Sequence, residues 1–328
     1  MFFMIISKAP LRISFFGGGT DIPEWFNHEN RMGYVFGGTI NQYVYVYGLP
    51  QPTFEKTKLK FSYRNVEEVS NIDDLSHPTF RILLKEMNWD EPLNAGTFAN
   101  LPGRSGLGSS SSFLVAAIKT ISKLQKVDFN QHEIAKLAIK IEREILEEAG
   151  GWQDQLHASF SGTRAYTFNN GSYEVLEKIS DEKITLLNKS IFLLASGEER
   201  KSSDLAEHTT KIAKNTDKDN PFKSLADIAK EFTEKVYSCN TNALLNVISD
   251  GVKQTNEVKN SISHIINSQT LKQIKIGINS GAMAAKLCGA GGSGFILFIC
   301  DPNQIKKIAT VFPEENIIFP KLLKSKEK

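Results

Sequence analysis

The stretch Leu101–Ser112, with the sequence LPGRSGLGSSSS, restricts the fold of this 328-residue chain more than any other segment. Gly106 and Gly108 allow a tight turn and let a ligand approach the backbone closely. From Phe113 onward the apolar residues recur with helical spacing, so the pattern predicts a helix that starts at the serines. A glycine-rich loop that runs into a helix N-terminus attracts anions, because free N–H groups and the positive end of the helix dipole point at the ligand.

The same stretch is also compatible with an ordinary Gly/Ser turn that caps a helix. We favour a phosphate-binding loop, because Ser109–Ser112 supply four hydroxyls where one or two suffice for capping. The loop is not of the Walker type, which needs a Gly-Lys pair, and no such pair occurs in the sequence.

Composition excludes several classes of protein. The net charge of +2 gives no field that would favour nucleic acid or an anionic membrane, and no apolar run approaches the roughly 20 residues that span a bilayer. The opening MFFMII has no basic region before it and predicts a strand rather than a signal peptide. The three cysteines are scattered, which indicates reduced thiols in the cytoplasm and no disulfide framework.

A second glycine-rich segment follows an apolar strand near the start of the chain. Gly17-Gly18-Gly19 end that strand, Arg12 lies within it and Asp21 comes shortly after the glycines. A guanidinium and a carboxylate at such a turn can hold a phosphate and a hydroxyl. The alternative is a surface arginine and an aspartate that caps the next helix, and these residues alone favour the alternative.

A carboxylate lies on the apolar stripe of a long helix predicted over 131–148. Glu142 has Ala138 and Leu146 as its neighbours one turn away on the same face. A partly buried acid needs a partner or a metal ion; a glutamate at the stripe's edge that reaches solvent is the alternative, and both stay open. Gly150-Gly151 are predicted to cap this helix.

Asp154 follows that glycine pair and is placed to enter a cleft from the start of a second helix. His157 is predicted to be structural. A hairpin is predicted across Asn169-Asn170-Gly171, and a domain boundary near 182–189.

Other elements are predicted from periodicity and turn residues. Strands are expected over 2–7, 35–49, 59–63, 97–100, 191–195 and 295–299, and helices over 79–87, 203–215, 221–238, 242–267 and 271–280. A third glycine-rich segment, Cys288–Gly294, precedes the strand at 295–299. A dinucleotide fingerprint would follow a strand and open a helix, so these glycines are instead a loop between two strands that admits a close neighbour or a ligand.

The three segments near 9–21, 102–112 and 288–294, taken in this order, resemble the three motifs of the GHMP small-molecule kinases. The resemblance implies an α+β fold of two domains. These are an N-terminal ATP-binding domain over 1–185, like domain 2 of ribosomal protein S5, and a ferredoxin-like C-terminal domain over 186–328.

Within the family, Gly17–Asp21 departs from the galactokinase pattern G-E-H-T-D, because glycines replace the glutamate and the histidine. Together with G-G-x-Q-D-Q at Gly150–Gln155, it resembles the D-glycero-D-manno-heptose 7-phosphate kinases, and fucokinase domains share parts of it. We interpret the missing side chains as room for a larger substrate.

The resemblance implies a role for each motif residue. Asp154 is implied to accept the proton of the attacking hydroxyl and Arg12 to neutralise developing charge, while Ser110 and Glu142 are implied to hold Mg²⁺. The residues implied to cradle the ATP phosphates are Pro102, Gly103, Arg104, Ser105, Gly106, Leu107, Gly108, Ser109, Ser110 and Ser111. Those implied to bind the sugar are Gly18, Gly19, Thr20, Asp21, Asp154, Gly291 and Gly292.

The implied activity is transfer of phosphate from ATP to the anomeric hydroxyl of D-glycero-D-manno-heptose 7-phosphate, for nucleotide-heptose or surface-polysaccharide synthesis. The alternatives are a fucokinase-like or other sugar-1-kinase and, more remotely, a catalytically silent sugar sensor. The expected partner is a small sugar phosphate, without nucleic acid or membrane, and a homodimer stays open. The candidates for holding the distal phosphate are not ranked; they are Arg31, Arg81, Arg104, Arg200 and Lys201.

Overall fold

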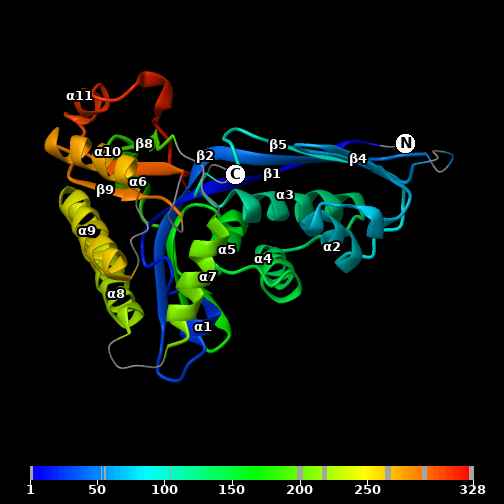
Figure 1. The fold of residues 1–328 in the computed structure, drawn as a ribbon, viewed down its shortest axis with the longest axis horizontal. Helices are drawn as coiled ribbons and strands as arrows, with labels where there is room; N and C mark the ends of the chain where they lie inside the picture. Colours follow the sequence, from blue (N-terminus) through cyan, green and yellow to red (C-terminus); the bar gives the residue numbers. More distant parts are fainter. Residues whose placement is uncertain are drawn as a thin grey trace.

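The computed structural model describes residues 3–52, 54, 57–103, 105–197, 202–215, 220–262, 267–289 and 294–324. They form two β-sheets with helices packed on both (Figure 1). The larger sheet contains β1 (Ile5–Phe16), β2 (Gly33–Pro50), β3 (Leu59–Ser62), β4 (Val66–Val69), β5 (Leu93–Ala99), β6 (Thr163–Asn169) and β7 (Ser172–Val175). The smaller sheet contains β8 (Ile191–Ala195), β9 (Ala284–Leu287), β10 (Phe295–Ile299) and β11 (Ile317–Ile318).

The helices fall into a group before β8 and a group after it. The first comprises α1 (Pro23–Phe26), α2 (Pro78–Glu86), α3 (Ser109–Leu124), α4 (Gln131–Ile139), α5 (Gln153–Phe160) and α6 (Asp181–Asn188). The second comprises α7 (Ser202–Ala213), α8 (Pro221–Ser238), α9 (Leu244–Ile262), α10 (Ser268–Asn279) and α11 (Ile305–Ala309). Short 3₁₀ turns cover Ile72–Asp74, Thr241–Ala243 and Glu314–Asn316, and a π-helix covers Lys140–Ile145.

The long strand β2 joins the parts of the larger sheet. One edge of β2 pairs antiparallel with β1, while its other edge pairs with β6 in its first half and with β5 in its second. The register of β1 shifts between Pro10 and Arg12 and again between Ser14 and Phe16. Such bulges re-aim side chains and recur beside active sites.

Helices α2, α3 and α4 lie along one face of the larger sheet (Figure 1). The core between them is apolar on both sides, since residues such as Leu11, Phe15, Leu114 and Ile118 are fully buried. The opposite face is more open, and Phe98, stacked on Tyr45 at 5.0 Å, is 54% exposed there.

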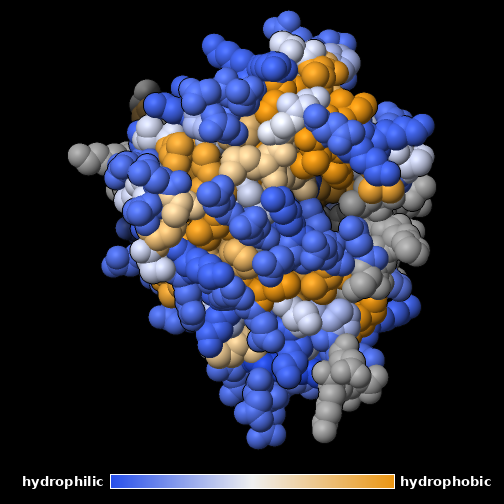
Figure 2. Space-filling view, turned by 90° about the vertical axis from the view of Figure 1, so that its left-hand side faces the viewer, coloured by the Kyte–Doolittle hydropathy of each residue, from blue (hydrophilic) through white to orange (hydrophobic). Residues whose placement is uncertain are grey.

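The antiparallel pair α8 and α9 lies beside the smaller sheet, whose strand order is β11-β8-β10-β9 (Figure 1). The α9 helix packs on both β9 and β1, so it spans the two sheets. On the side of the molecule where α8, α9 and α10 lie, hydrophobic residues form separate patches divided by polar ones (Figure 2). Within the described part of the chain, no helix has the length and hydrophobicity needed to cross a bilayer.

One buried lysine ties the two sheets together. Lys286 of β9 donates from Nζ to the carbonyl oxygens of Ser14 (2.8 Å) and Phe15 (3.0 Å) of β1. Its side chain is buried, and burial holds the pKa of its ammonium group well below the usual value. The smaller sheet is therefore attached to β1 at the point where β1 approaches the first glycine turn.

Most predicted elements are confirmed, and so is the predicted α+β architecture with two sheets. The hairpin is present, with Asn170 and Gly171 at φ of 49° and 74° between β6 and β7. The prediction of one α-helix over 131–148 is wrong in part. The α-helical part, α4, ends at Ile139, and the chain then forms the π-helix up to Ile145. The predicted boundary between residues 185 and 186 falls within α6 and stays a prediction.

Candidate active site

The glycine-rich loop enters α3 through a backbone conformation that only glycine adopts easily. Gly108, at φ 76°, is the N-cap residue, and no side chain caps the helix. The serine hydroxyls, which the sequence allowed as helix caps, therefore do not cap α3. The first-turn N–H groups remain available to a ligand, as an anion-binding loop requires.

The serines that follow point to other elements. Ser110 and Ser111 donate to the Glu142 carboxylate, from Oγ to Oε1 at 3.2 Å and from Oγ to Oε2 at 2.7 Å. Ser112 donates to the carbonyl oxygen of Pro10 in β1 at 2.8 Å. The run of serines thus connects the loop to the π-helix and to β1.

Glu142 is 2% exposed and lies in the π-helix, a conformation often found at functional sites. Besides the two serines, Gln155 of α5 donates from Nε2 to Glu142 Oε2 at 2.5 Å. Burial raises the pKa of Glu142 to about 7, because these hydrogen bonds only partly offset the loss of water. Of the two interpretations of Glu142, the buried acid with partners is correct.

Asp154 and Arg12 form a bidentate ion pair. Arg12 donates from Nε to Oδ1 at 2.7 Å and from Nη2 to Oδ2 at 2.8 Å, while its Nη1 donates to the Gly106 carbonyl oxygen at 2.6 Å. The Arg12 side chain is 6% exposed and that of Asp154 is 27% exposed. This geometry fixes the carboxylate next to the glycine-rich loop and leaves it open to a ligand.

The third glycine-rich segment and the start of β10 contact the backbone of this loop. Phe295 N donates to the Ser105 carbonyl oxygen at 3.2 Å. A Cβ atom added to Gly106, at φ 74°, would lie 2.5 Å from the Cys288 carbonyl oxygen. Close contact between the two backbones therefore requires glycine at 106.

Asp21 is buried and organises the turn between the glycines and α1. Its carboxylate accepts from Gly19 N at 2.8 Å and from Gln153 N at 3.0 Å, and burial raises its pKa. It does not cap α1, whose N-cap residue is Ile22. Gly150-Gly151 do not cap the preceding helix either, because the C-cap residue of the π-helix is Leu146. A Cβ atom on Gly151 would lie 1.8 Å from Asp21 Oδ2, so Gly151 makes room for Asp21.

The remaining predicted substrate residues have distinct positions. The Thr20 hydroxyl bonds the carbonyl oxygens of Gly17 and Tyr34 and is fully buried, so it braces the turn. A Cβ atom on Gly18 would lie 3.0 Å from Gln153 Nε2 and 3.3 Å from Ser14 Oγ. The space that we expected for a larger substrate at Gly18 is therefore occupied by two polar groups.

The structure brings most of the predicted site residues together. Seven of them are neighbours: Arg12, Asp154, Gly106, Gly108, Ser110, Ser111 and Glu142. Asp21 is connected to this group by the hydrogen bond from Gln153 N. Pro102, Gly103, Ser105, Leu107 and Ser109 complete the described part of the loop, and Leu107 accepts from Arg12 N at 3.0 Å. Arg104, Gly291, Gly292, Arg200 and Lys201 lie outside the described residues.

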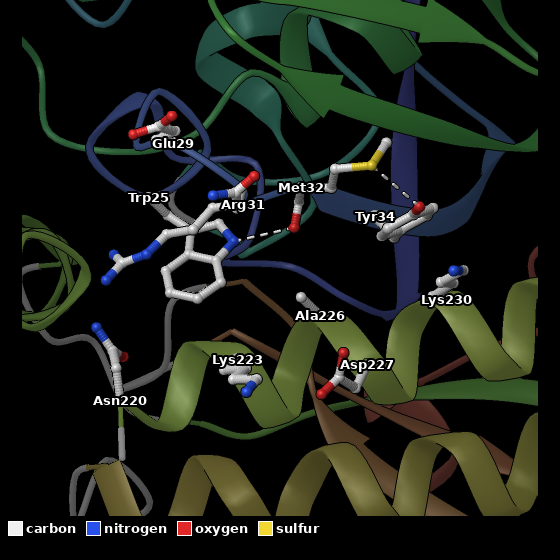
Figure 3. A pocket seen from close by; sticks show the side chains of 11 residues that line it. Trp25, Glu29, Arg31, Met32, Tyr34, Asn220, Lys223, Ala226, Asp227 and Lys230 are labelled. Carbon is white, nitrogen blue, oxygen red and sulfur yellow. Dashed lines mark hydrogen bonds between the residues drawn. The ribbon is translucent and has the colours of Figure 1, made fainter. Parts of the chain in front are cut away.

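Two candidates for the distal phosphate lie elsewhere. Arg81 donates to the Leu75 carbonyl oxygen at 2.6 Å, in α2. Arg31 lies 4.4 Å over the Trp25 ring, at a separate cavity of about 560 Å³ between the α1–β2 turn and α8 (Figure 3). That cavity is also lined by Lys223, Asp227 and Lys230 of α8.

Three polar residues at or beside the site were not found from the sequence: Ser14, Lys259 and Lys286. Lys259 carried a usable signal, because it follows buried Thr255 by one turn on an otherwise apolar helix face. His157 is fully buried, and burial holds its pKa well below the usual value, so the ring is neutral.

Comparisons with known proteins agree with the resemblance seen in the sequence. Residues 75–162 match the GHMP kinases N terminal domain. A D-glycero-alpha-D-manno-heptose 7-phosphate kinase of Campylobacter jejuni is 28% identical over 316 residues, covering 92% of this chain and 90% of that protein. A bifunctional fucokinase/GDP-fucose pyrophosphorylase of Arabidopsis thaliana is 24% identical over 92% of this chain, which spans only 30% of that larger protein.

Solved structures show the same fold along the whole chain. A D-glycero-D-manno-heptose 1-phosphate kinase of Bacteroides thetaiotaomicron has a TM-score of 0.76 at 19% identity, with 98% of this chain and 96% of that one covered. The mevalonate kinase of Methanococcus jannaschii has a TM-score of 0.74 at 18% identity, with 98% and 99% covered. The matched domain, the relatives and the fold agree: residues 75–162 match a GHMP kinase N-terminal domain, and the chain as a whole is similar to GHMP kinases in sequence and fold.

Proposed function

We propose that this protein is an ATP-dependent kinase that phosphorylates the anomeric hydroxyl of D-glycero-D-manno-heptose 7-phosphate, giving the 1,7-bisphosphate. The observation that carries the proposal is the Asp154 carboxylate, which Arg12 holds beside the glycine-rich loop at the start of α3. A base beside an anion-binding loop is the arrangement that phosphoryl transfer to a hydroxyl requires. The 28% identical relative from Campylobacter jejuni suggests the sugar.

In this mechanism the protein mainly positions groups and stabilises charge. The loop around Gly106 and Gly108 and the first turn of α3 bind the phosphates of ATP. Asp154 takes the proton from the sugar hydroxyl while the hydroxyl oxygen forms a bond to the γ-phosphorus. The bond between the γ-phosphorus and the oxygen that bridges it to the β-phosphate breaks, and ADP leaves. Arg12 offsets the negative charge that develops there.

Glu142 and Ser110 form a donor set that fits Mg²⁺. The ion commonly binds one or two carboxylates together with phosphate oxygens and waters, and a buried carboxylate with a raised pKa gains from a cation beside it. Among the described residues no cluster of three or more His, Cys, Asp or Glu side chains competes for a metal. When bound, the ion would neutralise phosphate charge.

Asp21 binds a sugar hydroxyl in this proposal, with Gly18 and Gly19 beside it. We further propose two domains, over 1–185 and 186–328, action in the cytoplasm, and a role in nucleotide-heptose or surface-polysaccharide synthesis. A homodimer is compatible with these assignments.

The test is ADP release with ATP and Mg²⁺ across a panel of acceptors. It contains D-glycero-D-manno-heptose 7-phosphate, sedoheptulose 7-phosphate, fucose, galactose, mannose and mevalonate. We expect strong turnover with the aldoheptose phosphate alone. Turnover with free fucose would instead support a fucokinase-like enzyme, as the Arabidopsis relative suggests, and no ADP with any acceptor would favour a silent sugar sensor.

A further inference from the structure

Lys259 is a partly buried cation that none of the assignments above uses. It belongs to α9, on the face that packs against β1 and β9. Along this face a Cβ atom on Gly251 would lie 3.0 Å from a ring carbon of Phe16, and Thr255 is fully buried. Lys259 follows Thr255 by one turn, so its side chain emerges from the same face beside the first glycine-rich segment.

The Lys259 ammonium group lies within electrostatic range of the Asp21 carboxylate and the Arg12 guanidinium. Burial lowers the pKa of this group, because the surrounding protein excludes water from it. The residue nevertheless keeps part of its surface exposed.

The neighbouring cations already have bonded partners. Arg12 pairs with Asp154, and Lys286 donates to two carbonyl oxygens of β1. Lys259, in contrast, makes no ion pair or hydrogen bond with the residues that the structure describes. A cation held in a poorly hydrated site without a bonded partner is costly unless an anion joins it.

A second unpartnered polar group lies in the first glycine-rich segment. Ser14 is 8% exposed, and its Oγ has no hydrogen-bond partner among the described residues. This oxygen lies 3.3 Å from the position of a Cβ atom on Gly18, so it borders the glycine turn. A hydroxyl can donate to a phosphate oxygen at such a position.

We propose that the Lys259 ammonium group, with the Ser14 hydroxyl as a donor, binds the phosphate that the sugar carries at the end remote from the reacting hydroxyl. This inference rests on the proposed function and names the residues that select a phosphorylated sugar over a free one. Asp21 binds a hydroxyl between the two ends of the substrate. Gly18 stands where the galactokinase pattern has Glu, so no side chain at this position separates the buried Ser14 hydroxyl from the turn.

The test compares KM values for D-glycero-D-manno-heptose 7-phosphate and for the unphosphorylated heptose. Lys259→Met is expected to raise KM for the phosphorylated sugar about 10- to 100-fold, the range for losing a hydrogen bond to a charged group. We expect kcat, and KM for the free heptose, to change less than about threefold. Lys259→Arg keeps the charge and is expected to recover most of the affinity.

Lys230→Met is the matched control, because Lys230 is an exposed lysine that lines the separate cavity along α8. It should leave both KM values unchanged. If Lys259→Met unfolds, Lys259→Gln replaces it. An equal loss with both sugars would overturn the proposal, since it would mean that Lys259 only balances the charge of Asp21.

Binding of inorganic phosphate, measured by calorimetry with ADP and Mg²⁺ filling the nucleotide loop, separates this inference from the proposed function. We expect wild type and Lys230→Met to bind phosphate, and Lys259→Met to bind it at least about 10-fold more weakly. Phosphate binding that depends on Lys259, without turnover of any heptose phosphate, would remove the proposed substrate and keep the anion site. Phosphate affinity that is unmeasurable in wild type or unchanged in Lys259→Met would remove the site.

Discussion

Replacing Glu142 with glutamine should change how the stability of the unliganded protein depends on pH. The Glu142 pKa is about 7 in the folded protein and 4.5 for the free side chain. Because the folded pKa is the higher one, the contribution of this group to stability is fully present below pH 4.5 and is lost as pH rises through 7.

The magnitude follows from that difference. A shift of roughly 2.5 units corresponds to about 3 kcal/mol, of which about 2.5 kcal/mol is lost between pH 5 and pH 8. Glutamine cannot ionise, so Glu142→Gln should be free of this loss. Its amide still accepts from Ser111, and it can donate to Gln155 Oε1, which is buried and has no partner among the described residues.

The measurement is the free energy of unfolding in urea at pH 5, 6, 7 and 8, for both proteins without nucleotide or metal. We expect Glu142→Gln to gain about 2.5 kcal/mol relative to wild type from pH 5 to pH 8. Glu144→Gln, which alters an exposed carboxylate of the same π-helix, serves as the control. Parallel pH profiles for wild type and Glu142→Gln would refute the argument that burial raises the pKa of Glu142.

Three further predictions concern the loop and the base. Asp154→Asn should reduce turnover by about 10²- to 10⁴-fold and leave ATP affinity nearly intact; turnover within a few-fold of wild type would exclude it as the base. Gly106→Ala, which forces a Cβ atom onto the Cys288 carbonyl at a positive φ, should weaken ATP binding about 10- to 100-fold by calorimetry. An unchanged affinity would mean that the loop tolerates the shift. Ser112→Ala removes a buried hydrogen bond to β1 and should lower the free energy of unfolding by about 1–3 kcal/mol, without changing ATP affinity. A stability within error of wild type would show that the bond contributes nothing.

The sequence predicted best those features that depend on local backbone chemistry. Asn170-Gly171 specify a two-residue hairpin turn by themselves, since both residues accept positive φ. The junction of loop and helix at Gly108 was likewise predictable, although the capping role of the serines was not. Their hydroxyls bond to Glu142 and Pro10, which lie far away in the sequence.

The features that were missed depend on tertiary contacts. Apolar periodicity predicted an α-helix over 131–148. It carries no information about the contacts that Ser110, Ser111 and Gln155 make with Glu142, which lies in a π-helical turn. Gly150-Gly151 looked like a helix end because nothing in the sequence shows that Asp21 occupies the space beside Gly151. Lys259 follows Thr255 by one turn, but only the packing of α9 on β1 shows that this helix face lies beside the first glycine-rich segment.

The support of the glycine-rich loop by the second sheet has a consequence for synthesis on the ribosome. Every strand of the larger sheet has been made by residue 175, whereas the backbone that contacts Ser105 and Gly106 comes from residues 288 and 294–295. A nascent chain can therefore pair its first seven strands long before the loop has its support. Cellular ATP cannot stabilise such a chain by binding until nearly nine-tenths of it has been translated.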